Sequence, residues 1–302
     1  MHIEIIVHSA NAGALEQLRS VVALLRERSH EVYGRVTFER GDAERFASEA
    51  TERGADLVIA AGGDGTLNEV ANGLLAAAGG AGPDALPRLG VAPLGTANDL
   101  AAWLEMPLDP AAAVLAAVDA PTKVIDVARI NERYFVNVSS GGFGAEATEE
   151  APDRVKRALG TLAYVVTGAR KFASLQPSQA HFSSAGQVVH DGEFLLFAVG
   201  NGRRTGGGNW LTPRADLSDG LLDFCLVRAI SHAEFLRLLP DLRSGAHIDS
   251  EHVLYRQLPE LTVRPAEEIS VNADGEPIDA SEFVYAAIPS ALRLAAPVRL
   301  ST

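Results

Sequence analysis

The sequence predicts two domains: an N-terminal α/β domain of the doubly wound kind and a C-terminal β-rich domain built as an antiparallel sandwich. In the first third of the chain, short apolar runs alternate with stretches of helical periodicity, which is typical of a parallel sheet covered by helices on both faces. After about residue 123, short strand-like runs separated by turn residues dominate, and these favour an antiparallel sandwich or barrel. The length of 302 residues also suggests two domains.

The elements of the first domain are expected to follow one another as strand and helix. The expected strands cover 3–7, 31–38, 55–61 and 88–93. The expected helices cover 13–28, 42–54 and 66–78, and a further helix is expected to begin near Thr96. In this architecture, ligands bind beyond the carboxyl ends of the strands.

Strand-like runs fill most of the remaining chain, and two helices are expected among them, near 153–173 and 232–240. The expected strands cover 124–130, 134–140, 193–200, 221–227, 252–258, 260–265, 268–274 and 282–288. We therefore divide the chain into an α/β domain over 1–124, a β-sandwich over 125–289 and a C-terminal segment over 290–302. Whether that segment returns to the first domain is left open by the sequence.

The charge and composition limit the partners of the protein. A formal net charge of −13 argues against nucleic acid as a partner, because such proteins normally carry a basic face. It also argues against strong electrostatic docking on anionic lipid, so any membrane contact must come from a local basic or apolar patch. The N-terminus does not resemble a signal peptide, no apolar run is long enough to span a membrane, and the single Cys225 is expected in a strand. We expect a cytoplasmic protein with transient peripheral contact at the inner face of the membrane, and association into a homodimer is left open.

The most informative stretch is the loop Gly62-Gly63-Asp64-Gly65-Thr66, which lies between a predicted strand and a predicted helix. Glycines allow the backbone to approach a phosphate closely, and a helix N-terminus offers free N–H groups and partial positive charge. Thr66 is expected as the N-cap. A carboxylate at position 64 would repel phosphate unless Mg²⁺, or water bound to it, lies between them.

A second loop repeats this arrangement after the next strand, over 93–99 with Gly95 and Thr96. Two Gly-Thr turns on neighbouring strands suit one nucleotide. Asn68 and Glu69, on the first turn of the first helix, suit either structural caps or nucleotide-facing groups, and their positions alone do not decide between these roles.

Several other families are excluded by their missing motifs. The chain has no G-x-x-x-x-G-K-[ST] loop and no H-R-D loop, so it is neither a P-loop NTPase nor a protein kinase. The stretch 142–147 fits G-x-G-x-x-A, but no acidic residue follows at the spacing that a dinucleotide site needs.

Two further acidic stretches admit both a structural and a chemical interpretation. Asp274, Gly275 and Glu276 follow a predicted strand and suit a hairpin turn or a general base that accepts a hydroxyl proton. The segment 216–223 carries three aspartates around a turn, which suits turn geometry or a hard divalent ion. Arg203 and Arg204 precede it on a glycine-rich loop. Their side chains could equally well bind phosphate, bind a lipid headgroup or be solvated.

These stretches together resemble the diacylglycerol kinase catalytic superfamily, and most closely its bacterial YegS-type lipid kinases. The resemblance covers nearly the whole chain and rests on the ordered set "VTFERGDAERFA", "GGDGTLNEV", "PLGTANDLA", "GGG…L.P.A.LSDGLLD" and "NADGEP". GGDGT alone is shared with NAD kinases. In place of the family's Asn-Pro-x-Ser-Gly-like loop the chain has residues 9–13, of which only Gly13 matches, so no contact is assigned there.

The resemblance implies an ATP-dependent kinase that acts on a membrane lipid hydroxyl, with its active site in a cleft between the two domains. It implies Asp64 and Glu276 as catalytic groups, Glu276 being the proton acceptor. It implies a structural or regulatory Mg²⁺ held by the Asp219 side chain and the main-chain carbonyls of Asp216 and Leu221, besides the ion that accompanies ATP. The implied ATP contacts are Thr37, Gly62, Gly63, Asp64, Gly65, Thr66, Leu67, Asn68, Glu69 and Thr96.

The resemblance identifies the phosphate acceptor only as a class of lipid: a diacylglycerol, a phosphatidylglycerol-like lipid or a sphingoid base. A kinase for a soluble acceptor such as NAD, and a nucleotide-binding regulator without catalysis, are the alternatives. The predicted helix 154–172 mixes apolar and basic residues, which suits either the membrane surface or a solvated basic face on the β domain.

Overall fold

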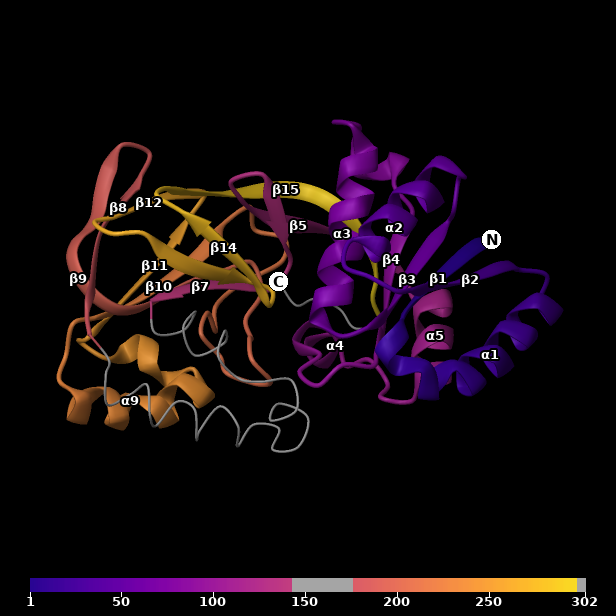
Figure 1. Cartoon of the computed structure of the whole chain (residues 1–302), viewed down its shortest axis with the longest axis horizontal. Coiled ribbons are helices and arrows are strands. Elements are labelled where there is room, and N and C mark those ends of the chain that lie inside the picture. Colours follow the sequence, from indigo (N-terminus) through magenta and orange to yellow (C-terminus); the bar gives the residue numbers. More distant parts are fainter. Residues whose placement is uncertain (143–175, 298–302) are drawn as a thin grey trace. The chain divides into compact units, whose positions relative to one another are not determined.

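The computed structural model describes residues 1–142 and 176–297, and these divide into two compact units (Figure 1). Unit 1 comprises Met1–Val127, Leu217–Asp219 and Ile288–Thr302, and unit 2 comprises Ala128–Asp216 and Gly220–Ala287. The expected helix over 154–172 lies outside the described residues.

Unit 1 contains a parallel sheet in the order β4-β3-β1-β2. Its strands are β1 (His2–His8), β2 (Glu31–Thr37), β3 (Leu57–Gly62) and β4 (Arg88–Pro93). The helices are η1 (Ser9–Ala14), α1 (Leu15–Glu27), α2 (Asp42–Glu52), α3 (Asp64–Ala78), η2 (Pro83–Ala85), α4 (Asp99–Trp103) and α5 (Pro110–Asp119).

Helices cover both faces of this sheet, which confirms the doubly wound prediction. α2 packs against α3 on one face and α1 packs against α5 on the other (Figure 1). Every residue of β3 is therefore buried, and the strand reads as a continuous apolar run rather than an alternating one.

The sequence analysis did not predict α5, although two signals mark its start. The carboxylate of Asp109 accepts a hydrogen bond from the Ala112 N–H at 2.8 Å, and Pro110 occupies the first helical position. Asp followed by Pro is a typical helix beginning, because Asp caps the free N–H groups and Pro needs none.

Unit 2 is built from antiparallel strands, as predicted. Their order is β14-β13-β7-β9-β8-β12-β15; β10 pairs with β9 and β11 with β10, while β5 pairs with β15 and β6 with β5. The strands are β5 (Thr122–Ile130), β6 (Arg133–Phe135), β7 (Val138–Gly142), β8 (Ser178–Ser184), β9 (Gln187–Gly200), β10 (Leu222–Arg228), β11 (Val253–Leu258), β12 (Glu260–Pro265), β13 (Ile269–Ala273), β14 (Glu276–Ala280) and β15 (Phe283–Ala295). α9 (His232–Ser244) and η3 (Ala246–Asp249) complete the unit.

Two hydrophobic cores share the alternating side chains of β10. Leu222, Phe224 and Leu226 face a cluster rich in phenylalanine, whereas Cys225 and Val227 face the helix α9. Successive side chains of a strand point to opposite faces, so one strand serves both cores. Cys225 lies in a strand, as expected, and burial raises the pKa of its thiol to about 12.

Two strands belong to both units: β5, in which unit 1 ends at Val127, and the last strand, β15. Phe283 pairs with β12 in unit 2, and Leu294 pairs with Leu89 of β4 in unit 1. The Arg293 guanidinium also donates to the Leu86 carbonyl at 3.2 Å. No helix among the described residues is both long and apolar enough to cross a membrane.

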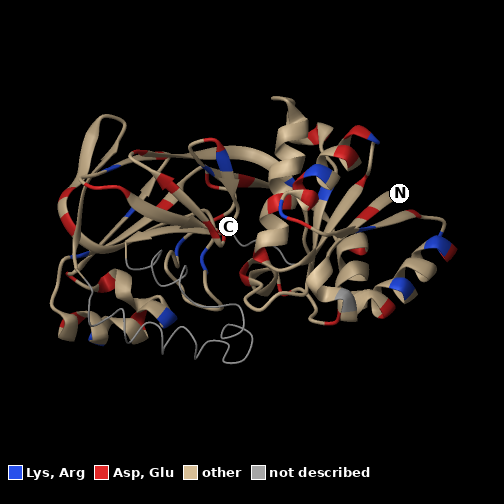
Figure 2. Ribbon diagram, in the orientation of Figure 1, with Lys and Arg blue, Asp and Glu red and all other residues tan. Residues whose placement is uncertain are grey.

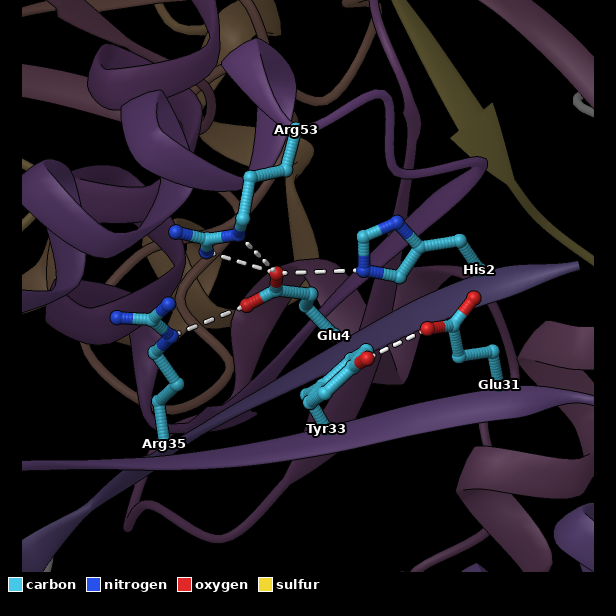
Figure 3. A pocket seen from close by; sticks show the side chains of 6 residues that line it. All are labelled: His2, Glu4, Glu31, Tyr33, Arg35 and Arg53. Carbon is cyan, nitrogen blue, oxygen red and sulfur yellow. Dashed lines mark hydrogen bonds and ion pairs between the residues drawn. The ribbon is translucent and has the colours of Figure 1, made fainter.

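A buried carboxylate ties α2 to the sheet of unit 1 (Figure 3). The side chain of Glu4 on β1 is 1% exposed. It accepts hydrogen bonds from Arg53 at 2.7 and 3.0 Å and from Arg35 at 3.2 Å. Buried charge is stable only when it is paired in this way.

Glu4→Gln is therefore expected to lower the free energy of unfolding by about 2 kcal/mol, measured by urea denaturation. An amide lacks the negative charge that both guanidinium groups face, and breaking a buried pair is costly. The control is Glu16→Gln, whose side chain is 81% exposed and pairs with the equally exposed Arg19, and it should change stability by less than about 0.5 kcal/mol. Equal effects of the two substitutions would show that the Glu4 pairs contribute nothing.

Candidate functional site

Two glycine turns lie side by side at the carboxyl edge of the unit 1 sheet. β3 ends at Gly62 and β4 ends at Pro93, and these two residues are paired in the parallel register. The Leu94 N–H donates to the Gly62 carbonyl at 2.8 Å, so the pairing continues into the turns. The pocket of Figure 3, lined by His2, Glu4 and their neighbours, lies instead toward the beginnings of β1 and β2.

The backbones of the two turns approach too closely for side chains. A Cβ on Gly95 would lie 2.4 Å from the Gly63 Cα of the other turn. Within the first turn, a Cβ on Gly62 would lie 2.3 Å from the hydroxyl oxygen of the Thr66 side chain. Gly62 and Gly95 are thus required by packing. Gly65 differs from them, because a Cβ there would meet no atom within 4 Å, so the fold alone does not explain this glycine.

The carboxylate of Asp64 connects one turn to the other. Its Oδ1 accepts a hydrogen bond at 2.9 Å from the N–H of Asp99, the first residue of α4. Burial raises the pKa of Asp64, and the nearby Asp99 carboxylate raises it further, against the lowering effect of main-chain donors at the start of α4. The charged form of Asp64 would therefore gain from a cation nearby.

Both helices begin at other residues than the sequence analysis expected. α3 starts at Asp64 with the extended Gly63 as its N-cap, so the prediction of Thr66 as the N-cap was wrong, and Thr66 is buried in the first turn. α4 starts at Asp99, and Thr96 is an exposed residue of the preceding turn.

The sequence analysis assigned no role to Asn98, which holds the second turn together. Its side-chain oxygen accepts from the Gly95 N–H at 2.9 Å, and its amide donates to the Gly95 carbonyl at 2.8 Å. Asn98 adopts a left-handed backbone with a φ of 51°. Asn tolerates this conformation better than most residues, and that preference was the available signal.

Several other predicted nucleotide contacts are engaged within the fold of unit 1. Glu69 accepts a hydrogen bond from the Ala43 N–H at the start of α2, at 3.2 Å. Asn68 is buried and accepts from the Asn72 amide at 3.1 Å. The side chains of Glu69 and Asn68 thus have structural partners. Leu67 is buried, and so is Thr37 at the end of β2.

The second carboxylate site, in unit 2, is a two-residue hairpin turn between β13 and β14. Asp274 and Gly275 have φ values of 50° and 94°, as a type I′ turn requires. The Asp274 carboxylate accepts from the N–H groups of Val136, Asn137 and Val138 at 2.7 to 3.2 Å. Asp274 is thus a structural residue, and Glu276 is the partly exposed carboxylate of this hairpin.

The residues predicted to hold a second metal ion come from both units. Leu217–Asp219 belongs to unit 1, where the Leu217 carbonyl accepts from the Asp126 N–H at 2.6 Å, whereas Asp216 and Leu221 belong to unit 2. Among the described residues, no three side chains of His, Cys, Asp or Glu gather in a way that could hold a metal. The predicted site relies on one carboxylate and main-chain carbonyls, an all-oxygen donor set that suits Mg²⁺.

Known proteins that resemble this chain do so over most of its length. The model of the diacylglycerol kinase catalytic domain matches residues 3–130, and that of the YegS C-terminal NAD kinase beta sandwich-like domain matches residues 137–296. A probable lipid kinase YegS-like from Pseudomonas aeruginosa is 38% identical over 97% of this chain and 93% of its own length. The chain belongs to the YegS-like diacylglycerol kinase family. A probable lipid kinase YegS from Escherichia fergusonii is 37% identical over 93% of this chain and 92% of its own.

Solved structures of a diacylglycerol kinase and of an NADH kinase share the fold. A crystal structure of a diacylglycerol kinase from Bacillus anthracis aligns with a TM-score of 0.70 and 19% identity, over 99% of this chain and 98% of that one. Yeast NADH kinase complexed with NADH aligns with a TM-score of 0.52 and 12% identity, over 99% of this chain and 84% of that one. At these identities the likeness concerns the fold alone.

Proposed function

We propose that the protein is an ATP-dependent lipid kinase, which transfers the γ-phosphoryl group of ATP to a hydroxyl of a membrane lipid. The observation that carries this proposal is the N-terminus of α3, which follows Gly63 at the carboxyl edge of the parallel sheet. Gly63 has no side chain to cap the helix. The first N–H groups of α3 and the positive end of its dipole therefore suit a phosphate group.

Gly65 supports a ligand at this position. It lies in the first turn of α3, and no packing contact or left-handed backbone requires a glycine there. Gly in a helix costs about 1 kcal/mol relative to Ala, so a fold without a ligand would favour Ala. Close approach of a phosphate to the main chain would account for it.

Asp64 would act through Mg²⁺. A carboxylate repels a triphosphate directly, and burial already disfavours its charged form. Mg²⁺ accompanying ATP would supply charge neutralisation of the phosphates. Asp64 would then hold that ion, directly or through water, while keeping α4 in place through the Asp99 N–H. The second Mg²⁺, at Asp216, Asp219 and Leu221, remains a proposed structural or regulatory ion.

Glu276 is proposed as the general base. The lipid hydroxyl oxygen forms a bond to the γ-phosphorus, the bond from that phosphorus to the β,γ-bridging oxygen breaks, and ADP leaves. The hydroxyl proton passes to the Glu276 carboxylate. Asp274 does not suit this role, because its oxygens accept three main-chain N–H groups.

The nature of the acceptor rests on the relatives, which are described as probable lipid kinases. The test is a transfer assay with labelled ATP and Mg²⁺ against total lipid extract and against NAD, with the product identified by mass spectrometry. Phosphorylated lipid supports the proposal, and phosphorylated NAD would assign a soluble acceptor. ATP binding without transfer to either would indicate a regulator.

The substitution Gly65→Ala tests whether Gly65 is needed for nucleotide binding or for the stability of the fold. We expect the free energy of unfolding to stay unchanged or rise by up to about 1 kcal/mol, while ATP binding weakens at least about tenfold because the new methyl group occupies the phosphate position. Thermal unfolding and ATP titration with Mg²⁺ measure the two effects. Gly34→Ala on the edge strand β2, where a Cβ also meets nothing, should leave ATP binding unchanged. If Gly65→Ala binds ATP with unaltered affinity, no phosphate of ATP lies against this turn.

Glu276→Gln is expected to reduce turnover at least about 100-fold and to leave the ATP dissociation constant unchanged, because the amide cannot accept the proton. The measurements are steady-state transfer to the identified acceptor and ATP titration. Asp279→Asn removes an exposed carboxylate from the same strand, β14, and should retain normal turnover. Near-normal turnover of Glu276→Gln would exclude Glu276 as the base.

A further inference from the structure

A phenylalanine at the end of β2 is left almost wholly in solvent. Phe38 directly follows the last residue of that strand and is 86% exposed. Among the described residues, no large apolar side chain is more exposed. Its neighbours Glu39 and Arg40 carry opposite charges, and acidic and basic positions are interspersed through unit 1 (Figure 2). Packing within the described part of unit 1 therefore does not explain an aromatic ring at this position.

The main chain that carries this ring is held in place by hydrogen bonds. The N–H groups of Phe38 and Glu39 both donate to Oδ2 of Asp42, at 2.8 and 3.2 Å. Asp42 is buried and also accepts from the Arg45 guanidinium at 2.7 Å. Because the backbone is already fixed, a ligand that covers the ring would have little of the chain to order.

The same segment is bonded to the helix that begins at the phosphate turn. The Ala43 N–H, at the start of α2, donates to the Glu69 carboxylate at 3.2 Å. Glu69 lies in the second turn of α3, and α2 packs against α3 (Figure 1). The loop that carries Phe38 and the first turns of α3 therefore belong to one packed region of unit 1.

The strand register places Phe38 at the height of the phosphate turn. β1 pairs with β2 through His8 and Thr37, and with β3 through Val7 and Ala61. Thr37 is thus level with the residue after Ala61, which is the last of β3, and Phe38 is level with the N-cap of α3. Only β1 lies between the two strand ends, so they are about 10 Å apart, twice the spacing of neighbouring strands.

The topology favours a nucleotide that extends from the phosphate turn toward β1 and β2. On the β4 side, the second turn already approaches the Gly63 backbone, and the Leu94 N–H bonds to the Gly62 carbonyl. On the other side, β1 leads into α1 on one face of the sheet, whereas β3 leads into α3 on the opposite face. Neighbouring strands that diverge in this way form a crevice at their carboxyl ends, where ligands of such sheets bind.

We propose that the ring of Phe38 is the surface on which the base of ATP stacks. This inference rests on the proposed function, because it takes the phosphates of ATP to lie at the start of α3. The base then extends across the end of β1 to the end of β2. An exposed apolar ring gains when a flat aromatic base covers it, and stacking of this kind contributes several-fold or more to nucleotide affinity.

Removal of the ring should weaken the binding of ATP and leave the binding of inorganic tripolyphosphate, which has no base, unchanged. We expect Phe38→Ala to raise the ATP dissociation constant at least about fivefold. Phe38→Tyr keeps the aromatic face and should bind ATP as the wild type does. Calorimetric titration of each ligand with Mg²⁺ measures these constants. Thermal unfolding of the variants should match that of the wild type, because the ring is exposed.

Tyr33→Ala is the matched control, because it removes a half-exposed aromatic ring from the same strand. Tyr33 lies toward the beginning of β2, in the pocket of Figure 3 and away from the carboxyl edge. This substitution should leave the ATP dissociation constant unchanged. Gly65→Ala, by contrast, should weaken ATP and tripolyphosphate alike, since it acts on the phosphate position.

A second measurement does not depend on a loss of affinity. Phe38→Trp puts an indole at the stacking position, and ATP should quench its fluorescence because the base lies against it. Tripolyphosphate should not. The wild-type protein, which contains Trp103 and Trp210, supplies the background response to both ligands.

The outcomes separate this proposal from the proposed function. Unchanged ATP affinity in Phe38→Ala, or equal losses for ATP and tripolyphosphate, would overturn the stacking and leave the proposed function intact. If the wild type binds ATP with the predicted dependence on Phe38 but phosphorylates no acceptor, the stacking surface stands and the proposed kinase activity fails. If the wild-type protein binds no ATP, both fail.

Discussion

The candidate site of unit 1 depends on the close approach of two backbone turns, at Gly63 and Gly95. Parallel pairing of β3 with β4 brings the ends of these strands together, and glycine at 95 leaves out the Cβ that would lie 2.4 Å from the Gly63 Cα. Asp64 then bonds across to the first N–H of α4. Each part needs the others, because the hydrogen bond forms only when the backbones are this close. The start of α3 is positioned by these constraints and not by a side-chain cap.

This arrangement places two demands on Asp64. As a hydrogen-bond acceptor it holds α4, and as a buried carboxylate it is disfavoured in its charged form, which raises its pKa. A site that had only to join two turns would be served as well by a neutral acceptor. A carboxylate that is kept despite its burial is typical of functional positions, where the missing stabilisation comes from a ligand. The same division appears at the hairpin of unit 2, where Asp274 bonds the main chain and Glu276 remains partly exposed.

The sequence predicted most of the strands and helices and both glycine loops, because these follow from local periodicity and from residues with strong backbone preferences. It did not predict α5, β8 or β14. It did not predict where α3 begins, because the extended backbone of Gly63 already leads into the helix and Thr66 is drawn into the packing against Gly62. It also left the role of Asp274 open, since the N–H groups that this carboxylate accepts are 136 to 138 positions away along the chain. Contacts of that range depend on the fold of unit 2 and cannot be read from neighbouring residues. The role of Asn98 could have been predicted from the local sequence, because both of its hydrogen bonds are made to Gly95, three residues before it.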